Sequence, residues 1–371
     1  VESAVTNPQL VTGELKPRSV KLAGVAAFVF ASLIGLLLTY YSGWPVLAIG
    51  CLGVIAGYSY TAGFYPYKYK GLGTILVFFL MGPLMVWPAY FIQTGKYSLA
   101  PVLASLPVAA LAKPNSRVRG VMMGAQSYSF RDRSLDDAIK AMGEIGLSYV
   151  ELWQGHVEPR GSREEVRKWR LSVPMEEIRK VRAKLDAAGI NLYAYNYSFR
   201  DDFSDAEIER GFEFAHALGV KYLTASGTVT VAKRISPFAE RAKVFVGMHN
   251  HSNIKPNEFA RPDDFAEAMR DTSSYIGVNL DTGHFTAAGF DPVDYLAKHH
   301  DRIYVIHIKD RKKNQGPNVA FGLGDTPNRE VLCMLRDKKW PIPAMIEYEY
   351  KGADTVAEVK KCYAWMKQAV K

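Results

Sequence analysis

Four apolar runs in the C-terminal part of the chain each end in a residue type that binds metal ions. The runs are KVFVGMHNH, YIGVNLDTGH, RIYVIHIKD and PAMIEYEY, and the residues at their ends are His249, Asp281, His307 and Glu347. Each run has the length and β-branched content of a buried strand. Two imidazoles and two carboxylates without a thiolate suit a hard or borderline divalent cation. The sequence therefore predicts one divalent metal site for Mn²⁺, Mg²⁺ or Zn²⁺.

The spacing of these four residues indicates that they lie on successive strands. Asp281 follows His249 by 32 residues, His307 follows Asp281 by 26, and Glu347 follows His307 by 40. Each interval is about one strand-and-helix unit, and in a barrel of parallel strands the carboxyl ends open on one face. A single His or Asp in such a run is more often a hydrogen-bonded buried group than a ligand, so the prediction depends on the set of four.

Strand-like runs alternate with helical patterns from residue 121 to residue 371, which predicts an α/β fold, the (β/α)8 TIM barrel. Strands are expected at 121–130, 148–154, 191–199 and 221–227, followed by the four that carry the ligands. Helices are expected at 135–145, 175–188, 205–218, 263–271, 292–300, 329–338 and 355–370, with a short, proline-interrupted helix near 231–242.

The first 112 residues have a different composition and predict an all-α transmembrane segment of three to four helices. Between residues 22 and 112 the only charged residues are Lys68, Lys70 and Lys96. Residues 22–41 form an uncharged run of the roughly 20 residues that cross a bilayer core. Runs at 46–63 and 73–93 continue the pattern, and a fourth at 98–112 contains two prolines. We therefore expect a membrane segment at 1–112, a linker at 113–120 and the barrel at 121–371.

Basic residues around the first two runs predict the orientation of a multi-pass membrane protein. Lys16, Arg18 and Lys21 precede the first run, and Lys68 and Lys70 follow the second, which places both loops on the cytoplasmic side. The barrel is then cytoplasmic if the fourth run spans, and on the exported side if it does not. An alternative for the junction is the small-residue ending of a secretory signal peptide in ASLPVAALA.

The charge balance argues against a nucleic-acid partner. The formal net charge is +9, but the basic residues are spread over both parts without a dense run of Lys and Arg among aromatic residues. Cys51, Cys333 and Cys362 are too few and scattered for a disulfide framework or a thiolate zinc site. The expected partners are a membrane and a small molecule, and the sequence leaves the oligomeric state open.

Residues 121–371 resemble the xylose-isomerase-like TIM barrels, the sugar phosphate isomerase and epimerase group whose fold endonuclease IV shares. The motifs that carry the resemblance are SYSFRD, YVELW, HNH, NLDTGH, HIKD and IEYE. The resemblance implies the same four metal ligands, and it implies that His284, three residues after Asp281, contacts a substrate oxygen. Members of the family often carry Glu where His249 stands.

Such a site supports proton abstraction next to a carbonyl, because a metal ion stabilises the enediolate while a carboxylate moves the proton. Glu347 is the expected base as well as a ligand, and Glu151 is the expected second carboxylate. Glu349 is expected to be a solvated charge at the rim. The predicted function is a metal-dependent isomerase or epimerase of a sugar or sugar phosphate.

Five other polar or aromatic residues at the strand ends are expected to contact substrate, although each also fits a packing role: Trp153, Asn196, His251, Lys309 and Asp310. Lys309 and Asp310 alternate to opposite sides of their strand, so at most one of them faces the mouth of the barrel. His251 shares a face with His249 and is either a partner of the ligands or a structural residue.

The N-terminal part resembles UbiA-type polyprenyl transferases, particularly the branch that prenylates dihydroxynaphthoate. The resemblance rests on LVTGELKPRSV, YSYTAGFYPYKYKGLG and VFFLMGPLMV. Family members hold Mg²⁺ through two acidic motifs; one would precede the first residue here, and Thr74 stands where the second is normally acidic. We therefore expect an anchor or relic rather than an active transferase.

Three other functions stay open: a lyase of the inosose dehydratase kind, a non-catalytic sugar-binding barrel, and a residual prenyltransferase-related membrane protein. An endonuclease IV-like activity would require further His ligands on the second and third strands, where Glu151 and Asn196 stand.

Overall fold

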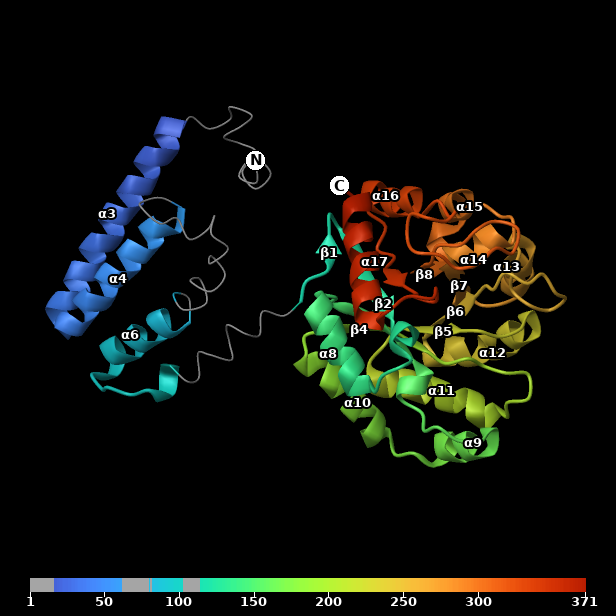
Figure 1. Cartoon of the computed structure of the whole chain (residues 1–371). Coiled ribbons are helices and arrows are strands. Elements are labelled where there is room, and N and C mark those ends of the chain that lie inside the picture. The colour runs from blue at the N-terminus through green and yellow to red at the C-terminus, as the bar shows by residue number, and fades with distance from the viewer. Residues whose placement is uncertain (1–16, 62–79, 81, 103–113) are drawn as a thin grey trace. The chain divides into compact units, whose positions relative to one another are not determined.

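The computed structural model describes residues 17–61, 80, 82–102 and 114–371, and the chain divides into two compact units, 1–112 and 113–371 (Figure 1). Several features of the predicted membrane segment lie outside the described residues. These are residues 1–16, the loop that carries Lys68 and Lys70, Thr74, the beginning of the third apolar run, and residues 103–112 of the fourth run.

The N-terminal unit is helical in its described part. Its helices are α3 (Pro17–Ser42), α4 (Trp44–Thr61) and α6 (Pro83–Thr94). Within the described residues, one helical stretch, Leu22–Ser42, is long and apolar enough to cross a membrane, and Trp44–Ser59 is a shorter apolar helix. The first apolar run therefore forms the expected helix, while the number of spans and their orientation stay predictions.

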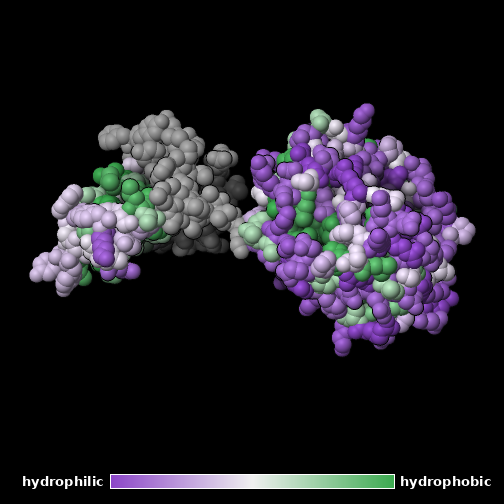
Figure 2. All heavy atoms as spheres, turned by 90° about the horizontal axis from the view of Figure 1, so that it is seen from below, coloured by the Kyte–Doolittle hydropathy of each residue, from purple (hydrophilic) through white to green (hydrophobic). Residues whose placement is uncertain are grey.

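Large apolar side chains are exposed mainly on the N-terminal unit. On the described barrel residues they are confined to Leu171, Ile254 and Leu323, whereas α3 and α4 expose Phe, Leu, Ile and Val along their length. Figure 2 accordingly shows a mostly hydrophilic face on the barrel. An apolar helix surface of this extent is suited to contact with lipid.

The second unit is the predicted TIM barrel. Eight parallel strands pair in chain order and close through β2 and β9. They are β2 (Val121–Gln126), β3 (Tyr149–Trp153), β4 (Asn191–Asn196), β5 (Tyr222–Ala225), β6 (Phe245–His249), β7 (Ile276–Asp281), β8 (Ile303–Ile308) and β9 (Ala344–Ile346). A short strand β1 (Arg117–Val118) pairs antiparallel with β2, so part of the segment expected to be a linker belongs to the sheet.

Ten helices and three 3-10 turns accompany the strands among the described barrel residues (Figure 1). The helices are α8 (Leu135–Ile145), α9 (Arg163–Ser172), α10 (Met175–Ala187), α11 (Asp205–Leu218), α12 (Val229–Ala242), α13 (Pro262–Met269), α14 (Thr282–Ala287), α15 (Pro292–His299), α16 (Asn328–Lys338) and α17 (Thr355–Ala369). The turns are η2 (Ser127–Phe130), η3 (Gln154–His156) and η4 (His300–Arg302).

Two of these helices were not expected from the sequence, and a third is longer than expected. The unexpected helices are α9 and α14, while α12 runs for 14 residues in spite of Pro237. The Thr228 hydroxyl accepts a hydrogen bond from the Val231 amide and caps α12, which therefore begins at Val229, two residues before the expected start.

Apolar side chains fill the barrel and the space between strands and helices. Inside the barrel Ala194, Val305 and Met345 form a fully buried cluster. These residues lie on β4, β8 and β9, and since β4 is not a neighbour of the other two, their contact crosses the interior. The interior is therefore a packed core, and the polar side chains at the carboxyl ends of the strands lie at its rim.

Candidate metal centre

The four predicted ligands lie together at the carboxyl ends of β6 to β9. His249 and Asp281 end their strands, His307 is the penultimate residue of β8, and Glu347 directly follows β9. One ligand atom from each side chain lies within 4.8 Å of the others, and all four residues are buried. Neighbouring strands bring the four side chains together, as the one-unit spacing in the sequence predicts.

The buried polar atoms of this cluster fit a cation. Among the described residues, both ring nitrogens of His249 and the Oδ2 atom of Asp281 are buried without a hydrogen bond. His249 Nε2 lies 3.7 Å from Asp281 Oδ2 and 3.7 Å from Glu347 Oε2, too far for a hydrogen bond and close enough to share a metal ion. The Lys309 ammonium lies 3.1 Å from Asp281 Oδ2, so the ring nitrogens of His249 are the atoms of the cluster that have no partner among the described residues. Buried polar groups normally have partners, and a metal ion bound here would supply one to His249.

Local structure fixes the orientation of Asp281. Its Oδ1 atom accepts a 2.6 Å hydrogen bond from the His284 amide and thereby caps helix α14. Its backbone is held to β6, because the Asn250 side chain accepts from the Asp281 amide at 2.9 Å and donates to the Asp281 carbonyl at 3.0 Å. One oxygen of the carboxylate is therefore used by the helix, and Oδ2 is left to face His249.

His307 is held between two carboxylates. Its Nδ1 atom lies 3.0 Å from Glu347 Oε2, and its Nε2 atom lies 2.6 Å from Glu151 Oε2. Burial by itself lowers the pKa of His307, but the charges of Glu151 and Glu347 outweigh it and raise this pKa to about 10. A metal ion that binds Nδ1 must therefore displace a proton.

Glu151 lies behind His307 rather than beside the open part of the site. It is fully buried, and its other oxygen accepts a 2.6 Å hydrogen bond from the Thr224 hydroxyl. A carboxylate that holds the second nitrogen of a ligating His fixes the ring and its tautomer. The structure thus places this predicted catalytic residue in contact with His307 Nε2 and the Thr224 hydroxyl.

Lys309 points into the cluster. Its ammonium lies 2.7 Å from Glu349 Oε2, 3.0 Å from Glu347 Oε2 and 3.1 Å from Asp281 Oδ2. Burial lowers the pKa of Lys309, and the three carboxylates more than offset this and raise it above its usual range. Glu349 was expected to be a solvated rim charge, but its side chain is only 25% exposed and is ion-paired with Lys309.

His284 lies between two cations. Its Nε2 atom is 3.0 Å from Lys309 Nζ, and its Nδ1 atom is 2.7 Å from Arg311 Nη1. Burial lowers the pKa of His284 to about 3, with Lys309 adding to this effect and Asp281 opposing it. The ring is therefore neutral and accepts a hydrogen bond from one of the two cations. Arg311 was missed in the sequence, although it directly follows the HIKD motif.

His251 lies at the opening of the cluster. Its ring centroid is 5.0 Å from that of His249 and 5.5 Å from that of His284. Burial and the nearby His249 lower its pKa to about 4. His251 also lines a recess of about 590 Å³ at the mouth of the barrel, together with Phe199, Ser226 and other residues of the strand ends.

The three remaining residues that were predicted to contact substrate, Trp153, Asn196 and Asp310, lie in different environments. Trp153 is half-buried and packs edge-on against Tyr128, with ring centroids 5.1 Å apart. The Asn196 amide donates to the Thr224 carbonyl at 3.2 Å. The Asp310 carboxylate accepts hydrogen bonds from the backbone amides at 322, 324 and 326, so it holds the loop after β8 and faces away from the metal cluster.

Comparison with known proteins shows which family the barrel belongs to. A family model described as the xylose isomerase-like TIM barrel matches residues 137–369. A solved structure of the IOLI protein with a binding zinc atom has a TM-score of 0.52 and 16% identity, and covers 67% of this chain and 97% of that chain. A D-tagatose 3-epimerase-like protein gives the same TM-score and identity, with coverages of 67% and 98%. At this identity the two structures show a shared fold alone.

The N-terminal part matches UbiA-type prenyltransferases, as the sequence motifs predict. The 1,4-dihydroxy-2-naphthoate octaprenyltransferase of Bacillus subtilis (strain 168) is 32% identical over 155 residues, which are 42% of this chain and 45% of that protein. UbiA prenyltransferase domain-containing protein 1 of Homo sapiens is 32% identical over 103 residues, 27% of this chain and 30% of that protein. The chain thus spans less than half the length of these relatives.

Proposed function

The chain belongs to the xylose isomerase-like TIM barrel family, and we propose that its barrel is a metal-dependent isomerase or epimerase of a sugar or sugar phosphate. The observation that carries the proposal is the buried cluster of His249, Asp281, His307 and Glu347, which contains unpartnered donor atoms beside a recess at the mouth of the barrel. The epimerase-like protein that shares the fold agrees with this class of reaction.

The four ligands would hold one divalent cation. When bound, such a cation polarises neighbouring carbonyl and hydroxyl oxygens and stabilises the charge of an enediolate. Two imidazoles favour zinc, and two carboxylates favour manganese or magnesium, so we propose one of these three ions. His249 makes the set less anionic than one with Glu at this position.

Glu347 is the proposed base. Burial raises the pKa of this carboxyl group, but Lys309 and His307 outweigh burial and hold the pKa well below its usual range. The group is therefore an ionised carboxylate, which is the protonation state that a general base requires. One base is sufficient to move a proton between adjacent carbons of the sugar. It removes the proton from one carbon and returns it to the neighbouring carbon on the same face of the enediolate.

Lys309 and His284 are proposed to contact substrate oxygens. The ammonium of Lys309 is a donor at 3.0 Å from both Glu347 Oε2 and His284 Nε2, so it lies beside the base and can stabilise a developing oxyanion by its charge and by a hydrogen bond. The neutral ring of His284 contacts a substrate hydroxyl without taking its proton, because its pKa is lowered to about 3. We assign Glu151 the separate role of orienting His307, since both of its oxygens are engaged.

We also propose that the N-terminal unit anchors the barrel to a membrane. Support comes from the apolar stretch Leu22–Ser42 and from the similarity to UbiA-type relatives. We propose that this unit crosses the membrane more than once and that the barrel lies on the cytoplasmic side. We also propose that it acts as an anchor or is a relic, rather than an active transferase.

The experiment that tests the enzymatic proposal measures metal content and proton exchange together. The full chain is purified in detergent, its Mn, Mg and Zn are quantified by mass spectrometry, and ketoses are incubated with it in D₂O. We expect about one metal ion per chain and metal-dependent exchange at the carbon next to the carbonyl. Asp281→Ala should abolish both, whereas Asp263→Ala, at an exposed position on α13, should change neither. A folded wild-type chain without metal or exchange would contradict the proposal and favour a sugar-binding barrel.

A further inference from the structure

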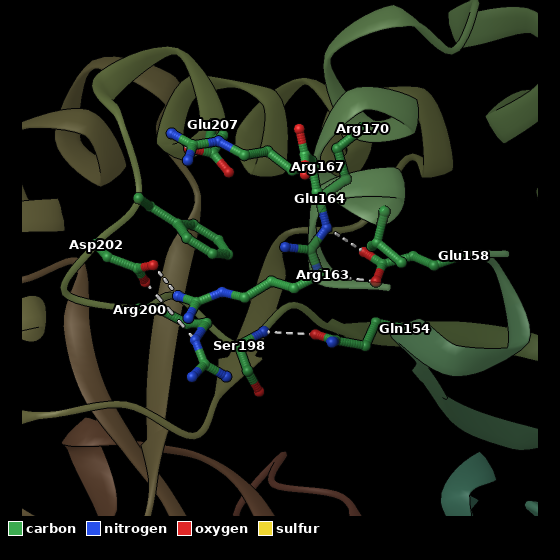
Figure 3. Close-up of a pocket in the computed structure, with 12 residues that line it drawn as sticks. Gln154, Glu158, Arg163, Glu164, Arg167, Arg170, Ser198, Arg200, Asp202 and Glu207 are labelled. Carbon is green, nitrogen blue, oxygen red and sulfur yellow. Dashed lines mark hydrogen bonds and ion pairs between the residues drawn. The ribbon is translucent and has the colours of Figure 1, made fainter. Parts of the chain in front are cut away.

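A second recess adjoins the one that His251 lines beside the candidate metal centre. It has a volume of about 620 Å³, similar to the 590 Å³ of the recess that His251 lines. Arg163, Arg200 and Asp202 line both recesses, so they form the wall between them. Figure 3 shows these three side chains converging, with Asp202 linked to both arginines. The binding space at the mouth of the barrel therefore has two compartments.

The second compartment is formed by extended loops at the carboxyl ends of β3 and β4. The connection from β3 to α10 runs from residue 154 to residue 174 and contains helix α9, which supplies Arg163, Arg167 and Arg170 to the lining. Connections between a strand and the next helix usually have about 2–6 residues. Long additions on this face of a TIM barrel are where substrate contacts are found.

The floor of this compartment is polar and fixed in place. Arg170 donates two hydrogen bonds to the carboxylate of Glu158, both 2.7 Å long, and the two side chains are only 8% and 6% exposed. The guanidinium also stacks over the rings of Tyr197 and Phe203, at 4.9 Å and 5.1 Å. A buried ion pair contributes little to stability compared with apolar side chains of similar volume. A buried, doubly hydrogen-bonded pair beside a hollow can instead help to orient a ligand.

A second buried carboxylate completes this lining. The side chain of Glu207 is 2% exposed, and its Oε2 atom is ion-paired with Arg167 Nη2 at 2.7 Å and accepts a hydrogen bond from the Ser204 amide at 2.8 Å. The Gln154 side chain accepts from the Ser198 amide at 2.8 Å (Figure 3). These groups are held by the protein and present hydrogen-bonding atoms around one hollow.

The charges of the lining cancel. Its arginines are Arg163, Arg167, Arg170 and Arg200, and its acids are Glu158, Glu164, Asp202 and Glu207. A site for a phosphate or carboxylate would carry an excess of arginine. Paired carboxylates and guanidinium groups instead offer both acceptors and donors, which suits a neutral ligand rich in hydroxyl groups.

We propose that this compartment is a subsite for a second sugar unit, and that the substrate is a glycoside of a keto sugar. The inference rests on the proposed function, since the metal centre must hold the reacting keto unit. The second sugar, which is bonded to the keto unit, lies on the other side of the wall that Arg163, Arg200 and Asp202 form. There it binds next to the ion pair of Glu158 and Arg170. A single sugar would leave the second compartment unused.

The test compares the binding of D-fructose with that of three disaccharides that contain a fructose unit: isomaltulose, turanose and lactulose. Titration calorimetry uses the full chain in detergent, loaded with Mn²⁺. We expect at least one disaccharide to bind roughly tenfold more tightly than fructose, because a second sugar adds hydrogen bonds to charged groups. Equal affinities, or no measurable binding of any disaccharide, would overturn the proposal.

Variants of residues in the wall and the lining test whether the preference for a disaccharide arises in this compartment. Arg163→Ala and, independently, Gln154→Ala should reduce the ratio of disaccharide to fructose affinity. Arg179→Ala is the matched control. Arg179, on α10, is 56% exposed and ion-paired, and Arg163 is 59% exposed and ion-paired with Asp202. Arg179 differs in that it does not line the recess. An unchanged ratio in both lining variants would count against the subsite.

Proton exchange in D₂O, measured with the same sugars, separates the two proposals. A disaccharide preference without exchange of any sugar would support the subsite and contradict the isomerase. Exchange of fructose without a disaccharide preference would support the isomerase and overturn the subsite.

Discussion

At the scale of single residues, the position of His307 decides how the metal centre is built. Glu151 and Glu347 approach opposite nitrogens of its ring, and Thr224 fixes Glu151 from behind. Since Nε2 is used by Glu151, the ring presents Nδ1 to Glu347. We therefore expect the binding of a metal ion here to depend on Glu151, a carboxylate that does not itself bind the metal.

Glu151→Gln tests this dependence. The amide can still accept from His307 and donate to the Thr224 oxygen, so the fold should be kept while the negative charge is lost. Loss of such a partner lowers metal affinity by roughly 10- to 100-fold. Competition with a fluorescent chelator measures the affinity. Glu144→Gln, at an exposed position on α8, is the control, and an affinity equal to that of the wild type would contradict the role of Glu151.

His156 should make the stability of the barrel dependent on pH. Its Nδ1 atom lies 2.9 Å from the Ser127 hydroxyl and its Nε2 atom 3.3 Å from the Phe130 carbonyl. Burial lowers the pKa of His156, and contacts with nearby carbonyls and Asp132 only partly oppose it. The unfolded chain, with a His pKa of about 6.5, then binds a proton that the folded chain does not. The free energy of unfolding should therefore fall as pH drops below about 6.5.

Thermal unfolding between pH 7.5 and 5.5 measures this effect. One proton contributes at most about 1.4 kcal/mol per pH unit. The stability advantage of the wild type over His156→Gln should shrink toward low pH. His216→Gln, at an exposed position on α11, should follow the wild type. Parallel curves for the wild type and His156→Gln would show that His156 does not cause the loss.

The functional residues that could be predicted from the sequence are those that a local sequence pattern marks. Each of the four ligands stands at the end of an apolar run, and parallel strands bring such ends together. The role of Glu151 depends on a partner 156 residues away across the barrel, and the contact of Lys309 with Glu349 depends on which side chain turns inward. Neither the register of the strands nor these side-chain directions can be read from spacing.

At the scale of elements, helix α9 is the main difference from the sequence-based expectation. It contains three apolar residues, Val166, Trp169 and Leu171, and the rest of its ten residues are charged or polar, so its apolar face is short. A capping box was nevertheless readable: Ser162 accepts from the Glu165 amide, and the Glu165 carboxylate accepts from the Ser162 amide at 2.7 Å. The helix is thus set by its cap and by charged contacts more than by an apolar face.

Ser162→Ala should loosen α9 without unfolding the barrel. Loss of an N-cap hydroxyl costs about 0.5–2 kcal/mol, and here the cost falls on a helix with little apolar packing. Hydrogen exchange with mass spectrometry should show faster exchange in residues 163–172 and unchanged exchange in β6 to β8. Ser172→Ala, at the other end of the same helix, is the control. Equal protection in the variant and the wild type would mean that packing alone holds the helix.

At the scale of the whole molecule, the chain joins two unlike units. The alternation of strands and helices predicted the barrel, because eight repeats of one pattern leave few other folds. The composition of residues 22–61 predicted apolar helices, but length and composition do not fix how many cross a membrane or in which direction. The first unit is similar to less than half of a prenyltransferase, and the chemistry of the proposed enzyme lies in the second unit.

The proposed metal ion connects four strands of that second unit, so its removal should lower the stability of the barrel. A ligand that binds the folded state alone stabilises it by about 2.7 kcal/mol at 100 times its Kd. For a domain of this size about 1 kcal/mol shifts Tm by 2–4 °C, so a chelator should lower Tm by roughly 5–11 °C. Scanning calorimetry of the full chain in detergent, with and without EDTA, measures the shift. Asp281→Asn should unfold at the same temperature in both conditions, because it lacks a ligand. A wild-type transition that EDTA leaves in place would mean that the buried charges of this cluster are balanced by Lys309 and protons rather than by a metal ion.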